Sequence, residues 1–121
     1  MERFWEVLFY HDSAGDSPVK DFIRNLPKVE RTRIGQGIES LEISGPSIRM
    51  PHARPITSEK GLFELRIKGE DNLYRIFYCH YTGKTFVLLH AFTKKTRKTP
   101  EKEIHIAKQR RTQFLKTMEN A

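Results

Sequence analysis

Five basic side chains in the C-terminal half of the sequence have the types and spacing needed to act on a phosphodiester: Arg66, Arg75, His90, Lys94 and Lys95. Guanidinium groups bind phosphate through paired hydrogen bonds, and lysines stabilise negative charge that develops in a transition state. A histidine exchanges protons near neutral pH. Because the ribose 2′-hydroxyl of RNA is an internal nucleophile, such a set predicts RNA cleavage without a metal ion or other cofactor.

Three segments with the composition of β-strands must position these side chains, and short turn sequences separate them. They are Leu62–Lys68, Leu73–Tyr81 and Lys84–Phe92. The loop GEDN between the first two has even length, so it places Arg66 opposite Arg75 on one face of the sheet. The same register pairs apolar residues with one another on the other face, which supports it.

The second hairpin extends this arrangement. A two-residue loop of Thr82 and Gly83 places Arg75 opposite His90, whereas a three-residue loop would shift the register by one and break that pair. The prediction is a row of Arg66, Arg75 and His90 across three strands, on the face away from the main core. Lys94 and Lys95 follow at its edge.

Two arginines directly opposite each other repel and destabilise a sheet. The fold must therefore either supply carboxylates or reserve the pair for an anion. Glu64 and Glu70 lie close enough in the sequence to supply them. Spacing alone leaves both a salt-bridged surface and a phosphate-binding site open.

The remaining elements complete a single α+β domain over residues 1–121, whose last few residues are candidates for disorder. A strand is expected at Phe4–Tyr10, a helix capped by Ser17, a second helix at Lys28–Ile43 and a last helix capped by Thr99. The expected order is β-α-α-β-β-β-α, with a mainly antiparallel sheet and helices packed on one face.

The formal net charge of +7 and the pI near 9.7 favour a polyanionic partner such as nucleic acid, although an acidic protein would be attracted by the same field. The single Cys79 excludes an internal disulfide, and the histidines lack metal-ligand spacing. Neither a membrane span nor a signal peptide is evident, so a cytoplasmic protein is expected.

Three stretches of the sequence are GLFELR, YRIFY and LLHAFTKKTRKTP. They resemble the RelE/ParE toxin superfamily, and in particular its HigB-like, phage-derived branch. The resemblance implies a RelE-like fold and the toxin of a type II toxin–antitoxin pair, acting on mRNA in the ribosome. It implies a cognate antitoxin with a helix-turn-helix as partner. By position, the basic residues of the family's site match Arg66, Arg75, Lys94 and Lys95. Four further residues are expected to bind RNA: Arg54, Lys68, Arg97 and Lys98.

The sequence departs from this pattern in one respect. Better-studied RelE-type enzymes carry a tyrosine near the start of the last helix, where this chain has RKTPEKE. His90 is the hypothetical substitute for proton transfer. Two other functions remain open, because fold does not determine function: a ParE-like inhibitor of DNA gyrase, and a nucleic-acid-binding protein without activity.

Overall fold

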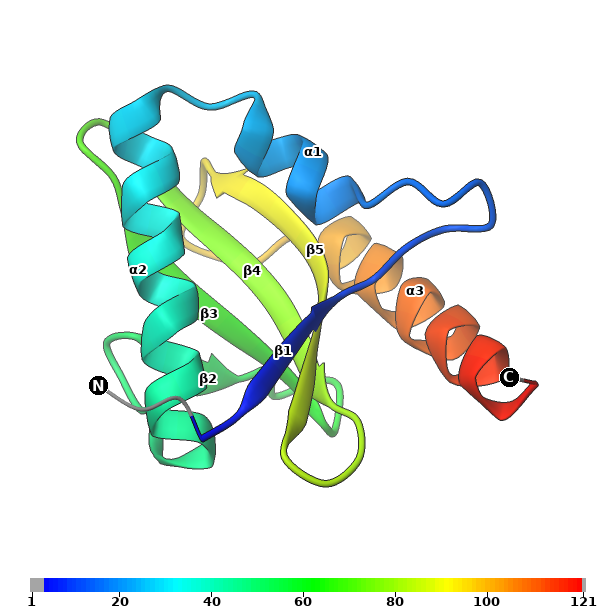
Figure 1. Cartoon of the computed structure of the whole chain (residues 1–121). Coiled ribbons are helices and arrows are strands. Elements are labelled where there is room, and N and C mark those ends of the chain that lie inside the picture. The colour runs from blue at the N-terminus through cyan, green and yellow to red at the C-terminus, as the bar shows by residue number, and fades with distance from the viewer. Residues whose placement is uncertain (1–3, 121) are drawn as a thin grey trace.

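The computed structural model describes residues 4–120, and a five-stranded sheet forms its centre (Figure 1). The strands lie in the order β1-β5-β4-β3-β2, and only the β1–β5 pair is parallel. Their bounds are Glu6–Phe9 (β1), Ala53–Pro55 (β2), Leu62–Lys68 (β3), Leu73–His80 (β4) and Thr85–Lys94 (β5). The predicted α+β class is confirmed. Strand β2 is an addition, in a segment where only turns were expected.

The helices are α1 (Pro18–Arg24), α2 (Lys28–Ser44), the short 3-10 helix η1 (Gly45–Ser47) and α3 (Glu101–Glu119). The predicted cap of α1 is confirmed, because the Ser17 hydroxyl accepts a hydrogen bond of 3.3 Å from the backbone N–H of Lys20. Helix α3 continues to Glu119, so of the candidate disordered end only Ala121 lies outside the described residues.

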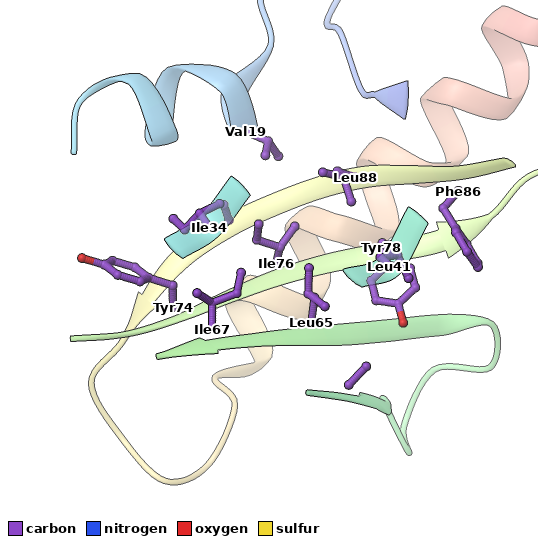
Figure 2. Packing of buried hydrophobic residues seen from close by; sticks show 12 residues of the cluster. Val19, Ile34, Leu41, Leu65, Ile67, Tyr74, Ile76, Tyr78, Phe86 and Leu88 are labelled. Carbon is purple, nitrogen blue, oxygen red and sulfur yellow. The ribbon is translucent and has the colours of Figure 1, made fainter. Parts of the chain in front are cut away.

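The main core lies between one face of the sheet and helices α1 and α2. Figure 2 shows Val19 from α1 and Ile34 from α2 next to the strand residues Ile76 and Leu88. All four side chains are fully buried. These contacts confirm the apolar stripes expected on both helices.

Helix α3 covers the opposite face of the sheet, so the prediction that all helices pack on one face is wrong. A second buried cluster contains Ala107 of α3 together with Phe77 and Leu89 from the strands. Strand β4 is apolar on both faces, and such a strand needs cover on each side. Helix α3 therefore lies on the face of the sheet that carries Arg66 and Arg75.

The predicted cap of α3 is also wrong. Pro100 occupies the N-cap position, and no side chain caps the helix. The Thr99 hydroxyl instead donates a hydrogen bond of 3.1 Å to Oε2 of Glu64 on β3. This contact anchors the loop before α3 to the sheet.

Two glycines of α2 give a matched pair of substitutions. A Cβ added at Gly37 would lie 2.8 Å from Cγ1 of Ile67, whereas one at Gly35 would meet nothing within 4 Å. We expect Gly35→Ala to stabilise the protein by about 0.5–1 kcal/mol through helix propensity. Gly37→Ala should lower stability by roughly 1 kcal/mol or more, because α2 must move away from β3. Thermal unfolding of both variants tests this, and equal shifts in melting temperature would contradict the close approach of α2 to β3.

Candidate functional site

The β3–β4 hairpin has the register that the sequence predicts. Arg66 lies opposite Arg75, and Glu64 lies opposite Phe77 on the same face. The apolar pairs of the other face are confirmed as well, including Leu65 with Ile76. Two neighbouring arginines are thereby placed on the face that α3 covers in part.

The predicted β4–β5 register is wrong, and His90 does not lie opposite Arg75. Arg75 pairs with Phe92, and His90 pairs with Phe77. The hairpin loop is one residue longer than expected, since the N–H of Tyr81 bonds to the carbonyl of Thr85. A register shift between Phe77 and Tyr78 adds a further displacement.

This second displacement is a β-bulge in β5. Leu89 packs in the cluster under α3, and the next residue, His90, lies opposite Phe77 on the same face. The longer loop and the bulge together place His90 two residues along the sheet from the pair of Arg75 and Phe92, on the same face as Arg75. Lys94 lies within β5, opposite Leu73 and two pairs beyond Arg75 and Phe92.

Glu64 is the centre of the charged group on this face. Its side chain is fully buried, and Oε1 lies 3.1 Å from Nε of both Arg54 and Arg75 and 3.9 Å from Nε of Arg66. One carboxylate therefore faces three guanidinium groups, with the charge of Lys94 acting on the same set. We call Arg54, Arg66, Arg75 and Lys94 around Glu64 the cation cluster. Glu64 therefore forms the salt bridges that the sequence left open as one alternative. The four cations still outnumber this one carboxylate, so a net positive charge remains.

Arg75 is the most enclosed member of the cation cluster, with 2% of its side chain exposed. Its Nη1 donates to the carbonyl of Tyr74, whereas Nε contacts Glu64 as an ion pair without hydrogen-bond alignment. Nη2 has no acceptor among residues 4–120. Burial lowers the pKa of Arg75 although Glu64 opposes this effect, and a guanidinium stays charged even so. A buried cation with an unsatisfied donor is suited to an anionic oxygen.

A cleft of about 420 Å³ opens beside this guanidinium, between the end of β5 and the start of α3. Besides Arg75, its charged lining residues are Lys94, Lys95, Lys102 and Glu103. Burial, followed by the charges of Arg75 and Arg66, lowers the pKa of Lys94. We call this the β5 cleft. It offers three lysines around one buried guanidinium, an arrangement that fits a phosphate.

His90 is held between β5 and α3. Its Nε2 lies 3.0 Å from Oε1 of Glu103, and its Nδ1 lies 3.0 Å from Nη1 of Arg110. Because a guanidinium only donates hydrogen bonds, Nδ1 is the acceptor and Nε2 carries the proton. Both ring nitrogens therefore have partners within the protein. The geometry is that of a histidine that positions α3.

A family model described as phage derived protein Gp49-like (DUF891) matches residues 21–112, well over half of the sequence. The chain belongs to the Gp49-like family. This family is a phage-derived, HigB-like toxin family of the RelE/ParE superfamily, which confirms the resemblance of the sequence. A search of curated proteins finds no match to the chain. Membership implies the toxin of a toxin–antitoxin pair, and therefore a cognate antitoxin.

The other basic residues assigned to this Gp49-like chain are spread around the cation cluster. Arg54 belongs to it, and Lys68 is exposed at the end of β3. Lys95, Arg97 and Lys98 are exposed in the loop between β5 and α3, and of these three basic residues Lys95 lines the β5 cleft. The structure thus brings together Arg54, Arg66, Arg75, Lys94 and Lys95, and it leaves His90 apart from them.

Sequence reasoning missed the residues that hold the site together. The sequence predicts Glu64 only as a neutralising neighbour of the arginines, and it predicts no role for Glu103 or Arg110. A charged residue within the apolar alternation of β3 was the available signal for Glu64. Nothing in the sequence pairs Glu103 and Arg110 with His90, because that contact depends on the side of the sheet that α3 covers.

The described part of this Gp49-like protein lacks two other kinds of feature, a metal site and a membrane-spanning helix. Within residues 4–120, no three His, Cys, Asp or Glu side chains form a group that could hold a metal ion. Of the helices described, none combines the length and apolar character needed to cross a membrane.

The environment of His90 predicts how stability depends on pH. Burial lowers the pKa of His90 from its ordinary value of 6.5, with Arg110 acting in the same direction and Glu103 against it. The folded protein binds this proton more weakly than the unfolded chain. The stability contributed by neutral His90 is therefore present above about pH 6.5 and is lost as the pH falls below that value.

We expect His90→Gln to lower the free energy of unfolding near neutral pH by about 1–2 kcal/mol, because two hydrogen bonds are weakened or lost. When the pH is lowered from about 7.5 to about 5.5, the free energy of unfolding should fall less for this variant than for the unsubstituted protein. Urea unfolding at both pH values measures this difference. His105→Gln, at an exposed position of α3, is the matched control and should keep the original pH dependence.

Proposed function

We propose that this Gp49-like toxin is an endoribonuclease that cuts mRNA on the ribosome through attack of the ribose 2′-hydroxyl on the adjacent phosphate. The observation that carries the proposal is the buried Arg75 guanidinium, whose Nη2 lacks an acceptor among the described residues and which lines a lysine-rich cleft. Such a group binds a phosphate oxygen without first giving up another partner.

The members of the cation cluster have distinct roles in this proposal. Arg75 and Arg66 bind the oxygens of the scissile phosphate, and their charge is most effective when negative charge develops there. Glu64 holds Arg54 and Arg75 in place, because it lies 3.1 Å from the Nε of each. This arrangement orients the donors before the substrate arrives, as electrostatic catalysis requires.

Lys94 and Lys95 are the proposed groups for proton exchange and charge neutralisation at the mouth of the β5 cleft. The lowered pKa of Lys94 increases the fraction of its amine that can accept the proton of the 2′-hydroxyl. The attacking oxygen forms a bond to phosphorus, the bond to the 5′-oxygen breaks, and that oxygen takes a proton. The products are a 2′,3′-cyclic phosphate and a 5′-hydroxyl end.

His90 was the sequence-based candidate for proton transfer, and this role stays a prediction. Its bonds to Glu103 and Arg110 favour a positioning role, in which His90 holds the first turns of α3 beside the β5 cleft. The absence of a tyrosine in RKTPEKE leaves Lys94 as the proposed proton acceptor. Docking on the ribosome supplies further positioning of the mRNA, and the net charge of +7 suits ribosomal RNA.

The test is induced expression of the unmodified protein, followed by mapping of mRNA ends and by a cleavage assay on purified translating ribosomes. The proposal expects growth arrest, new mRNA ends within reading frames, and cyclic phosphates on the upstream fragments. Growth arrest with intact mRNA would overturn it. A parallel DNA supercoiling assay with gyrase then identifies the ParE-like alternative, and unimpaired growth would favour a protein without activity.

A further inference from the structure

A second cleft, of about 500 Å³, lies between α2 and the edge of β3, and it shares Arg75 with the β5 cleft. Strand β2 pairs with Phe63–Leu65, and the N–H of Arg66 bonds to the carbonyl of His52, so within residues 4–120 the edge of β3 is uncovered only beyond Arg66. We call this opening the α2 cleft. Arg75 is the residue that lines both clefts, and it therefore stands at their junction.

Positive and neutral polar side chains line the α2 cleft. These are Arg33, Gln36 and Ser40 from α2, His52 before β2, and Arg66 and Lys68 from β3. No Asp or Glu is among its lining residues. The field inside the cleft is therefore attractive to a polyanion.

The α2 side chains form one stripe of the helix. Arg33, Gln36 and Ser40 are spaced by three and four residues, beside the buried stripe of Ile34 and Leu41. Gly37 lies in the same stripe, and its missing side chain lets α2 approach Ile67 closely. The backbone thus fixes the distance between this polar stripe and the edge of β3.

Several donors in the α2 cleft have no hydrogen-bond partner among residues 4–120. Nε of Arg66 is buried without a hydrogen-bond acceptor within residues 4–120, like Nη2 of Arg75. Within the same range, Arg33 and Gln36 form no side-chain hydrogen bond or ion pair. The cleft therefore presents hydrogen-bonding groups that a ligand could satisfy.

We propose that a single RNA strand passes from one cleft to the other, with the scissile phosphate at Arg75 and one flanking nucleotide in each cleft. Arg33 binds the next phosphate on the α2 side, and Gln36 contacts the edge of the base held there. This inference rests on the proposed nuclease function, because it takes Arg75 as the position of the scissile phosphate.

The size and the chemistry of the clefts support a single strand. Each has room for a flexible nucleotide with its base turned out of a helical stack, and neither could admit a duplex. Neutral amide and hydroxyl groups beside the cations, at Gln36 and Ser40, match base edges, whereas lysines alone would match only the backbone.

Photocrosslinking tests this path directly. The probe is a short mRNA, programmed on ribosomes, that carries a 2′-deoxy substitution at the cut site and a 4-thiouridine on one side of it or on the other. We expect the thiouridine on one side to crosslink to a peptide containing residues 33–40, and that on the other side to one containing residues 94–102. Crosslinks of both probes to the same peptide would overturn the inference.

Substitutions on α2 supply a second readout. Arg33→Ala is expected to weaken binding of a labelled single-stranded RNA about tenfold and to reduce the slope of log K against log salt concentration by about one. Lys28→Ala, which removes the same charge from an exposed position of α2 outside the cleft, should change affinity less than about twofold. Gln36→Ala should alter the distribution of cut positions, with Gln109→Ala on α3 as its control.

The outcomes separate this inference from the proposed function. Cleavage by the unmodified protein without crosslinks to residues 33–40 would remove the α2 cleft from the RNA path and leave the nuclease in place. Crosslinks on both peptides without cleavage of a natural mRNA would support the path and remove the nuclease. If Arg33→Ala weakened antitoxin binding and left RNA binding unchanged, the cleft would be a protein interface and the inference would fail.

Discussion

Replacing Arg75 by lysine is expected to reduce mRNA cleavage by about 10²–10³-fold on translating ribosomes, a loss typical of removing one preorganised donor from a charged transition state. Lysine keeps the positive charge beside Glu64 but lacks the planar guanidinium of arginine. The Nη2 of that guanidinium has no acceptor among the described residues and is the proposed donor to phosphate. Single-turnover rates at saturating toxin measure this effect. Growth arrest on induction should disappear in parallel.

The matched control for this variant is Arg24→Lys, because Arg24 is an exposed arginine of α1 that pairs with Asp21, its neighbour on the same helix. It should retain full activity. Thermal unfolding of Arg75→Lys shows whether the fold persists. A folded Arg75→Lys variant that cleaves mRNA at the original rate would remove the guanidinium from the mechanism.

Replacing Glu64 by glutamine is expected to lower the free energy of unfolding by about 3–5 kcal/mol, since one partner of a buried ion pair is removed. Arg75, with 2% of its side chain exposed, would then lie beside Arg66 without a buried carboxylate. The Thr99 hydroxyl bond and the Arg54 ion pair would be weakened as well. Urea or thermal unfolding measures the loss.

The control is Glu70→Gln in the β3–β4 turn, where the side chain is exposed. It should change stability by less than about 0.5 kcal/mol. If both variants unfolded at similar urea concentrations, Glu64 would not be the central partner of the cation cluster. If Glu64→Gln unfolded at a higher urea concentration than the unsubstituted protein, repulsion among the cations would be small.

The β3–β4 hairpin could be predicted because two independent signals agreed. An even-length turn and the alternation of apolar residues such as Leu65 and Ile76 fix one register, and a shift by one residue would expose the core side chains. Helices α1 and α2 were predictable for a similar reason, since Pro27 separates two apolar stripes. The pairing of Arg66 with Arg75 followed from these local patterns.

The position of His90 could not be predicted, because it depends on a bulge that leaves no mark in the sequence. Val87, Leu88 and Leu89 are all apolar, so either register buries apolar residues on both faces. In the structure, Leu89 packs in the same buried cluster as Ala107 of α3, on the face that α3 covers. The number of hairpin residues and the face covered by α3 were both needed to place His90.

Glu64 illustrates a second limit of prediction from the sequence, which concerns the burial of charged side chains. The sequence showed that carboxylates near two arginines would neutralise them, and it offered both Glu64 and Glu70. Only the tertiary structure shows that Glu64 is fully buried while Glu70 is exposed. It also shows that one carboxylate serves several cations and leaves Nη2 of Arg75 without an acceptor.

The parallel pairing of β1 with β5 bears on when a newly made chain acquires this site. Glu6 pairs with Thr85, so β1 cannot join the sheet until β5, which follows all the other strands in the chain, has been made. Lys94 and the α3 residues that bind His90 come later still. Contacts between such distant segments form slowly, after the local hairpins and helices. The cation cluster and the β5 cleft are therefore complete only after β5 has been made and has paired with β4.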